Sequence, residues 1–228
     1  MAAVLDFEFI DAHLPKQPIG PVTRRLLRRY KGVLDHANRI QETFYWCGPT
    51  TAQMILQAAG VAVSQQQMAT ALGTTVNGTN YVGLFPPVLN SRLPGSGYTA
   101  ADRPACEVLW DLVTGSIDAG LGVAANIVAT KGVDAPAFYP SGDTYHYVPI
   151  FGYRGEGAAR EMFCADSANF QGVTEWWAPL TQWVSLLSSK GIAPAARKDA
   201  FANFTDAEIA IMLGAAHQVG DPQIGRGL

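Results

Sequence analysis

The chain has 228 residues, of which 48% are hydrophobic and 15% are charged, and its formal net charge at pH 7 is −3. This length and apolar content are typical of one large folded domain and exclude an intrinsically disordered chain. The small negative charge argues against a dedicated nucleic-acid binder, which is usually strongly basic. No apolar run approaches the roughly 20 residues of a membrane helix, so we expect no membrane insertion.

Residues 1–40 are expected to form a basic lead-in segment that wraps the compact domain. Most of their basic side chains lie in residues 24–31, whose spacing is typical of a solvated helix face. The N-terminus carries acidic residues where a signal peptide needs a basic and then an apolar segment. We therefore expect synthesis in a cytoplasm without a secretion signal.

Helices dominate the first half of the compact domain, which is expected over residues 41–192. Gly60 ends the first of them, and a capping-box pattern at residues 64–67 opens the second. Hydrophobic residues recur at helical spacing over 105–119, and a further helix is expected around 81–93 despite Pro86-Pro87. The predicted helices cover residues 48–60, 64–73, 81–93 and 105–119.

The hydrophobic period then changes from helical to extended. The pattern predicts a buried strand over 121–128, a loop over 131–143, a hairpin formed by 145–154 and 161–166, and a last helix over 179–190. Helices followed by antiparallel strands define an α+β domain, with its helices segregated from a small sheet. Pro149 cannot donate in a sheet, so its strand is expected at an edge or bulged there.

Residues 193–228 are expected to be separate from the compact domain. They begin as a linker, and a second capping box at residues 205–208 opens an amphipathic helix. The last residues read as a connector to a further C-terminal domain.

Three cysteines, Cys47, Cys106 and Cys164, are too few for a disulfide scaffold. Cys47 lies at the N-terminal end of the first predicted helix, where unpaired amides and the helix dipole favour a thiolate. Cys106 is expected to be inert, and Cys164 to line the site from the face of its strand that also carries Asp166. The alternative for Cys47 is a buried, unreactive thiol.

His146 is the histidine expected to face that thiol, because it begins the central strand of the predicted sheet. The other three of the four histidines, His13, His36 and His217, are expected on the surface. Across the hairpin, Asp166 or Asn169 is placed to orient the imidazole.

Gln41 precedes Cys47 by six residues. Its amide, with the Cys47 backbone N–H, is placed to donate hydrogen bonds to the oxyanion of a tetrahedral intermediate. Four scattered histidines and the lack of a His-Glu-x-x-His motif argue against a metal site, and no cofactor is expected.

The ordered set Gln41, Cys47-Gly48-Pro49-Thr50, His146 and Asp166 resembles papain-like cysteine peptidases of the bacteriocin-processing (double-glycine leader peptidase) type. The resemblance covers about residues 41–190. It implies a papain-like fold with Cys47 as nucleophile, Gln41 as oxyanion donor, His146 as base and acid, and Asp166 as its orienting residue.

One departure from the family pattern concerns the orienting residue. Ser167 follows Asp166 where the family often has proline, which leaves Asn169 and Asp143 as alternatives.

Among unfused relatives, the chain looks most like the N-terminal peptidase modules of actinobacteriophage endolysins, especially those of mycobacteriophages. This resemblance implies hydrolysis of a peptidoglycan stem peptide or cross-bridge during host lysis. It also implies a monomer held in the host bacterial cytoplasm until a holin releases it, and a missing C-terminal catalytic or wall-binding domain. The alternatives are a cysteine amidase or acyl transferase on peptidoglycan, a leader-peptide-processing peptidase, and a non-catalytic cell-wall-binding module.

Overall fold

The computed structural model describes residues 32–196. The expected lead-in up to residue 31 and the expected tail from residue 197 lie outside the described residues. His13, His217 and the predicted tail helix lie outside them as well. The boundaries at residues 41 and 192 stay predictions.

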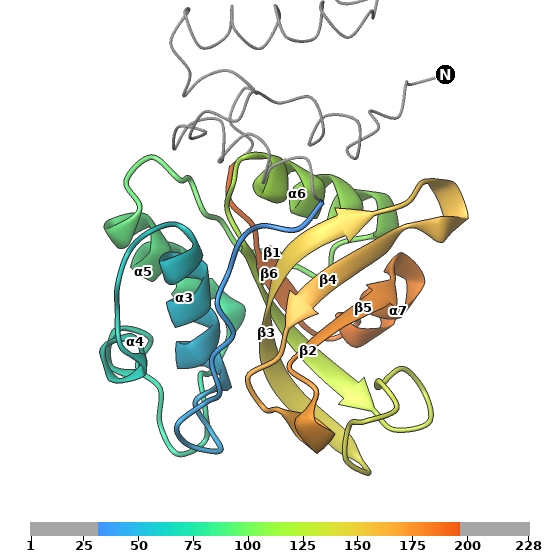
Figure 1. Cartoon of the computed structure of the whole chain (residues 1–228), viewed down its shortest axis with the longest axis horizontal. Helices are drawn as coiled ribbons and strands as arrows, with labels where there is room; N and C mark the ends of the chain where they lie inside the picture. The colour runs from blue at the N-terminus through green and yellow to red at the C-terminus, as the bar shows by residue number, and fades with distance from the viewer. Residues whose placement is uncertain (1–31, 197–228) are drawn as a thin grey trace, which may run out of the picture.

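Helices α3, α4 and α5 form one side of the molecule (Figure 1). Three of the helices predicted from periodicity are confirmed here, and Ser64 and Gln67 form the expected capping box at the start of α4. The observed bounds are Cys47–Ala58 for α3, Gln65–Ala71 for α4, Val82–Leu84 for the 3-10 turn η1 and Phe85–Arg92 for α5.

The start of α3 is shaped by small residues and a neighbouring loop. Pro49 lies in the first turn, where its missing N–H costs no helical hydrogen bond. A Cβ on Gly48 would lie 2.2 Å from Thr79 Oγ1, so the loop that carries Thr79 can approach only a glycine. The Cys-Gly-Pro sequence therefore allows close packing at the point where the helix presents Cys47.

A six-stranded sheet forms the centre of the fold, with the strand order β1-β6-β2-β3-β4-β5. All five neighbouring pairs are antiparallel. The strands are β1 Ala101–Asp102, β2 Val123–Thr130, β3 Asp143–Arg154, β4 Glu161–Ala165, β5 Glu175–Pro179 and β6 Gly191–Ala193.

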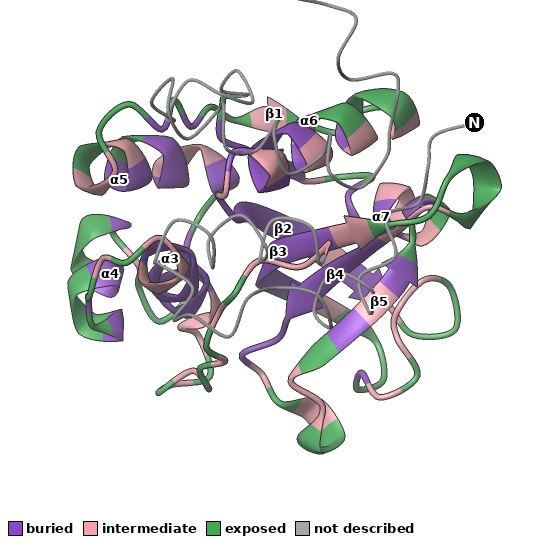
Figure 2. Cartoon of the chain, turned by 45° about the horizontal axis from the view of Figure 1, so that its top comes forward, coloured by how far each residue is buried: buried purple, intermediate pink, exposed green. Residues whose placement is uncertain are grey.

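Helices cover both faces of this sheet, and β2 and β3 are buried between them (Figure 2). One hydrophobic cluster joins α3, α4 and α5 to residues such as Ala124, Tyr147 and Phe151. The other joins α6 (Cys106–Asp118) and α7 (Leu180–Leu186) to the opposite face, which includes Val148 and Ile150. The expected α+β class, with helices packed on an antiparallel sheet, is thus confirmed.

Several predicted boundaries differ from the structure. The helix predicted over 179–190 ends at Leu186, and the strand predicted over 121–128 covers Val123–Thr130. The short strands β1, β5 and β6 were not predicted. Pro149 lies in an interior strand, so the edge alternative is wrong; an irregularity in the pairing with β4 follows it, between Ile150 and Gly152.

Residues 33–41, here called the strap, run across the sheet before α3 begins (Figure 1). The Leu34 N–H donates to the Phe151 carbonyl at 2.7 Å, and the Gln41 N–H donates to the Ser167 carbonyl at 3.0 Å. The prediction of a surface His36 is wrong, because its ring stacks on Phe151 with 4.5 Å between centroids and its side chain is 8% exposed. The strap thus runs from a bond with β3, at Leu34, to a bond with the turn after β4, at Gln41.

Candidate active site

Cys47 is the first residue of α3, and α3 packs against β3. No side chain caps this helix end, and no acidic residue lies in its first turn. The backbone N–H groups of Gly48 and Tyr147 lie beside the thiol and lower its pKa. The contribution of the Gly48 N–H was expected from the helix start. That of the Tyr147 N–H was not, because β3 reaches the thiol only in the folded structure.

His146 lies on β3 with 4% of its surface exposed, and it faces both Cys47 and Asp166. Its Nε2 lies 2.8 Å from Asp166 Oδ1. Because Nε2 is engaged by the carboxylate, Nδ1 is the ring nitrogen left for the Cys47 thiol. The structure therefore brings together the cysteine, the histidine and the aspartate expected from the sequence.

The Asp166 carboxylate accepts hydrogen bonds from four separate groups. His146 and the Ala168 N–H, at 3.0 Å, bond to Oδ1. The Tyr139 hydroxyl, at 2.6 Å, and the Trp176 indole N–H, at 3.1 Å, bond to Oδ2. With 1% of its surface exposed, Asp166 is a buried anion whose lone pairs are satisfied by these donors.

Tyr139 and Trp176 are members of the site that sequence reasoning missed. Tyr139 lies in the loop between β2 and β3, which carries no periodic signal, and Trp176 lies on β5, one of the strands that were not predicted. Trp176 lies in the core, stacked on Trp183 with 5.0 Å between ring centroids. Only its indole N–H reaches Asp166.

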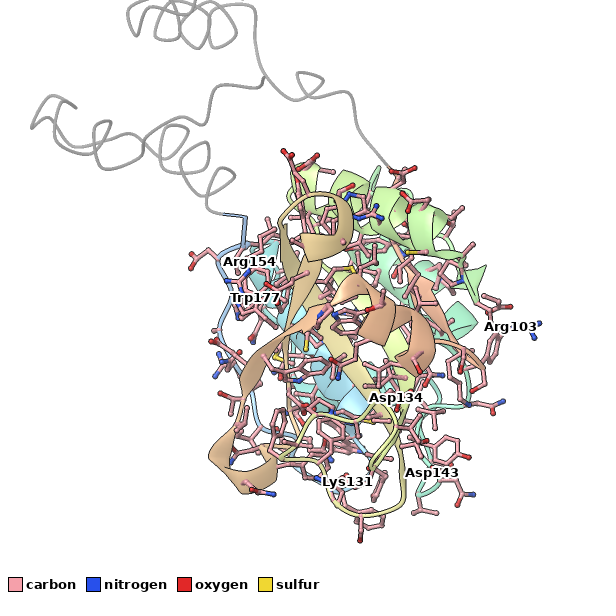
Figure 3. All side chains as sticks on the ribbon, turned by 90° about the vertical axis from the view of Figure 1, so that its right-hand side faces the viewer. Arg103, Lys131, Asp134, Asp143, Arg154 and Trp177 are labelled. Atoms are coloured by element: carbon pink, nitrogen blue, oxygen red, sulfur yellow. The ribbon has the colours of Figure 1, made fainter. Side chains whose placement is uncertain are left out.

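The two alternative orienting residues lie elsewhere. Asn169 is exposed, at a positive φ of 53°. Asp143 is exposed at the start of β3 and accepts a hydrogen bond from the Thr130 hydroxyl at 2.9 Å. Figure 3 places Asp143 at the same end of the molecule as Lys131 and Asp134. Of the three candidates, Asp166 is the one that bonds to His146.

Electrostatics favour a thiolate–imidazolium pair. Burial raises the pKa of Cys47, but the hydrogen bond and positive charge of His146 and two backbone amides outweigh burial and lower that pKa. Burial also disfavours the imidazolium, but Asp166 and the Cys47 thiolate raise the pKa of His146 to about 10. The pair is therefore charged from the lowered pKa of Cys47 up to about pH 10.

Gln41 lies at the end of the strap, close in sequence to the nucleophile. Its Nε2 donates to the Thr43 carbonyl at 3.0 Å, and its Oε1 accepts from the Ser167 hydroxyl at 3.1 Å. An amide Nε2 carries two hydrogens, so one remains for a substrate oxygen.

The other two cysteines lie outside this constellation. Cys164 is fully buried, and burial together with the Asp166 charge raises the pKa of its thiol well above the usual range. The expectation that Cys164 lines the site is not met, because its side chain packs in the core. Cys106 is half-buried at the start of α6.

Stoichiometric iodoacetamide at about pH 6 is expected to alkylate Cys47 while sparing Cys106 and Cys164. A lowered pKa keeps the Cys47 thiolate populated below the pKa of about 8.5 of a free cysteine, and the rate falls only as the pH drops through that lowered value. Peptide mass mapping gives the labelled fraction of each cysteine. Equal labelling of Cys47 and Cys106 would show that Cys47 is not activated.

A hollow of about 540 Å³ lies between α4 and the residues that precede α3, and Cys47 is not part of its lining. Tyr45 and Trp46, which directly precede Cys47, form part of its wall, and α4 and the loop 73–76 form the rest. Within residues 32–196, no group of three or more His, Cys, Asp and Glu side chains is placed to hold a metal ion. No helix in that part of the chain is long and apolar enough to cross a membrane.

A cysteine at the start of a helix, paired with a histidine on an antiparallel sheet, places this α+β protein among the papain-like cysteine peptidases. The model of the Peptidase_C39 like family matches residues 33–187, more than half of the chain. The chain belongs to this family.

Two solved structures that match the chain come from transporters. A double glycine motif protease from an AMS/PCAT transporter, in complex with its leader peptide, is 14% identical with a TM-score of 0.48, over 72% of this chain and 95% of that chain. The peptidase domain of Streptococcus ComA, a bifunctional ABC transporter in a quorum sensing pathway, is 15% identical with a TM-score of 0.46, over 71% and 99%. No curated protein matches the chain.

Proposed function

We propose that this protein hydrolyses peptide bonds by thiol acyl transfer at Cys47. The observation that carries the proposal is the buried Cys47–His146–Asp166 arrangement, in which one imidazole faces the thiol and a fully bonded carboxylate. Membership of a peptidase family supports the same chemistry.

The reaction begins with attack of the Cys47 thiolate on the carbonyl carbon of the scissile bond. The carbonyl oxygen becomes an oxyanion, which the Gln41 side-chain amide and the Cys47 backbone N–H stabilise. His146 gives its Nδ1 proton to the leaving amine, and the C–N bond breaks to leave a thioester on Cys47.

Water then completes the cycle. His146, now neutral, takes a proton from the water as its oxygen attacks the thioester. The C–S bond breaks, the carboxylic acid leaves, and the thiolate–imidazolium pair is restored. Asp166 holds the imidazole in one orientation through both steps, and no other reactant is required.

We further propose a peptidoglycan stem peptide or cross-bridge as the substrate. The support is the resemblance of the chain to the unfused N-terminal peptidase modules of actinobacteriophage endolysins. The Gln41, Cys47, His146 and Asp166 pattern itself is shared with the leader peptidases and supports only the thiol chemistry. On this proposal the protein is held in the host bacterial cytoplasm and reaches the wall after holin-mediated release.

Purified actinobacterial peptidoglycan is expected to release peptide fragments when incubated with the protein, and a peptide with a double-glycine motif is expected to stay intact. Mass spectrometry of the products identifies the bond. Whole stem peptides freed from muramic acid would instead identify an amidase. Cleavage of the double-glycine peptide alone would identify a leader peptidase.

If the protein binds peptidoglycan but releases no fragment, and its Cys47 is not activated, it is a non-catalytic wall-binding module. The Cys47→Ala variant is the matched control in each incubation, because contaminating hydrolases would survive that change.

A further inference from the structure

Ser167 makes two contacts with Gln41 that the mechanism above does not use. It follows Asp166 directly and is fully buried. Its hydroxyl donates to Gln41 Oε1 at 3.1 Å, and its carbonyl accepts the Gln41 N–H at 3.0 Å. One residue therefore fixes both the backbone and the side chain of the proposed oxyanion donor.

These contacts define which way the Gln41 carboxamide points. The Thr43 carbonyl can only accept a hydrogen bond, so it requires Nε2 on its side. The Ser167 hydroxyl donates to Oε1 on the other side. A flipped amide would set Oε1 against the Thr43 carbonyl oxygen, which is repulsive, and would lose the donation from Ser167.

The position of Ser167 also links two parts of the site. Asp166 orients the imidazole, and the next residue along the chain orients the amide of Gln41, which is 126 positions away in sequence. Because Asp166 and Ser167 share one turn after β4, that turn sets the geometry of the base and of the oxyanion donor together.

We propose that Ser167 is a positioning residue for acyl transfer: its hydroxyl holds the Gln41 carboxamide with Nε2 turned away from Ser167, so that one N–H is held for the oxyanion. This inference rests on the proposed function. An experiment can tell failure of this inference from failure of the proposed function, because formation of the Cys47 thiolate does not involve Gln41 or Ser167.

The test uses p-nitrophenyl acetate, which requires no knowledge of the natural substrate. The thiolate displaces p-nitrophenolate to form an acetyl thioester on Cys47, and water then releases acetate. Loss of an oxyanion donor lowers the rate about 10²–10³-fold. A donor that is present but no longer held in position is expected to cause a smaller loss, about 10-fold. Ser167→Ala is thus expected to slow acylation by about 10-fold, with the dissociation constant of the ester unchanged.

Two comparisons separate positioning from a merely structural role. In a Gln41→Ala background, Ser167→Ala is expected to cause no further loss of acylation rate. Ser116→Ala is the matched control, because Ser116 is also fully buried and its hydroxyl donates to the Leu121 carbonyl at 3.0 Å, away from the site. It is expected to lower stability while the acylation rate stays that of the wild type.

The inference is overturned if Ser167→Ala leaves acylation unchanged, or slows it equally with and without Gln41. It is also overturned if Ser167→Ala lowers the rate of Cys47 alkylation at pH 6, because the variant then disturbs the thiolate and not the amide. A wild-type protein with neither rapid alkylation nor ester turnover would instead defeat the proposed function.

Discussion

Replacement of Cys47 by alanine is expected to abolish peptide-bond hydrolysis and leave the fold intact. The change removes only Sγ, the atom that forms the thioester, and alanine keeps the helix start. Removal of a nucleophile from a catalytic triad costs about 10⁶-fold in kcat, so no turnover above background is expected. Release of peptide fragments measures the effect, and circular dichroism checks the fold.

Cys106→Ala is the control for this experiment. Cys106 also begins a helix, α6, and is also half-buried, but it lies outside the site. This variant is expected to keep full activity. Hydrolysis by Cys47→Ala at more than a trace of the wild-type rate would exclude Cys47 as the nucleophile.

Asp166→Asn is expected to cause the second largest loss, and to lower stability as well as activity. All four groups around the carboxylate are donors, whereas an asparagine has one acceptor oxygen, so its NH₂ group would face N–H or O–H groups. The equivalent change in a serine peptidase triad costs about 10⁴-fold in kcat, and we expect a loss of that order. Unsatisfied buried donors add a cost of about 1–3 kcal/mol.

The same substitution removes a pH dependence of stability. Burial raises the pKa of Asp166, but His146, Tyr139 and the Ala168 amide lower it overall. The carboxylate therefore stabilises the fold above its unfolded pKa of about 3.9, and this stabilisation is lost as the pH falls through the lowered folded value. Urea unfolding between pH 2 and pH 7 is expected to show a larger acid-side loss of stability in the wild type than in Asp166→Asn, which keeps only the contribution of the other carboxylates.

Asp143→Asn and Asn169→Ala are the matched controls, because both side chains are exposed and neither contacts His146. Each is expected to keep kcat within about twofold, because exposed side chains outside the Cys47–His146–Asp166 arrangement usually have small effects when replaced. Loss of activity in either variant, with Asp166→Asn still active, would contradict the assignment of Asp166.

Local patterns were sufficient for the helices. The helical spacing of apolar residues and the Ser64 capping box locate α3, α4 and α6 within two residues of their observed ends. The short strands were missed because β1 and β6 have only two and three residues, too few for alternation to appear. The last helix was predicted too long, because Gly191 indicates a helix end at residue 190, whereas the structure ends α7 at Leu186 and has a turn before β6.

The main residues of the site could be predicted from the sequence, but the residues that hydrogen-bond to Asp166 could not. Cys47 and His146 stand out because one begins a helix and the other begins a strand-like run. The choice among Asp166, Asn169 and Asp143 depends on register across an irregular hairpin, which no local pattern contains. Tyr139 could not be predicted, since its role arises only when a loop folds over the end of β4.

The strap has a consequence for how the protein would lose activity. It ends at Gln41, which is hydrogen-bonded to Ser167 in the turn after β4, and several of its residues are exposed, such as Asp35, Ala37 and Arg39. Segments of this kind open locally at a lower free energy than the core. The active enzyme is therefore governed by two equilibria, local opening of the strap and global unfolding of the core. Gentle heating is expected to lower activity reversibly by opening the strap while Cys47, His146 and Asp166 stay assembled.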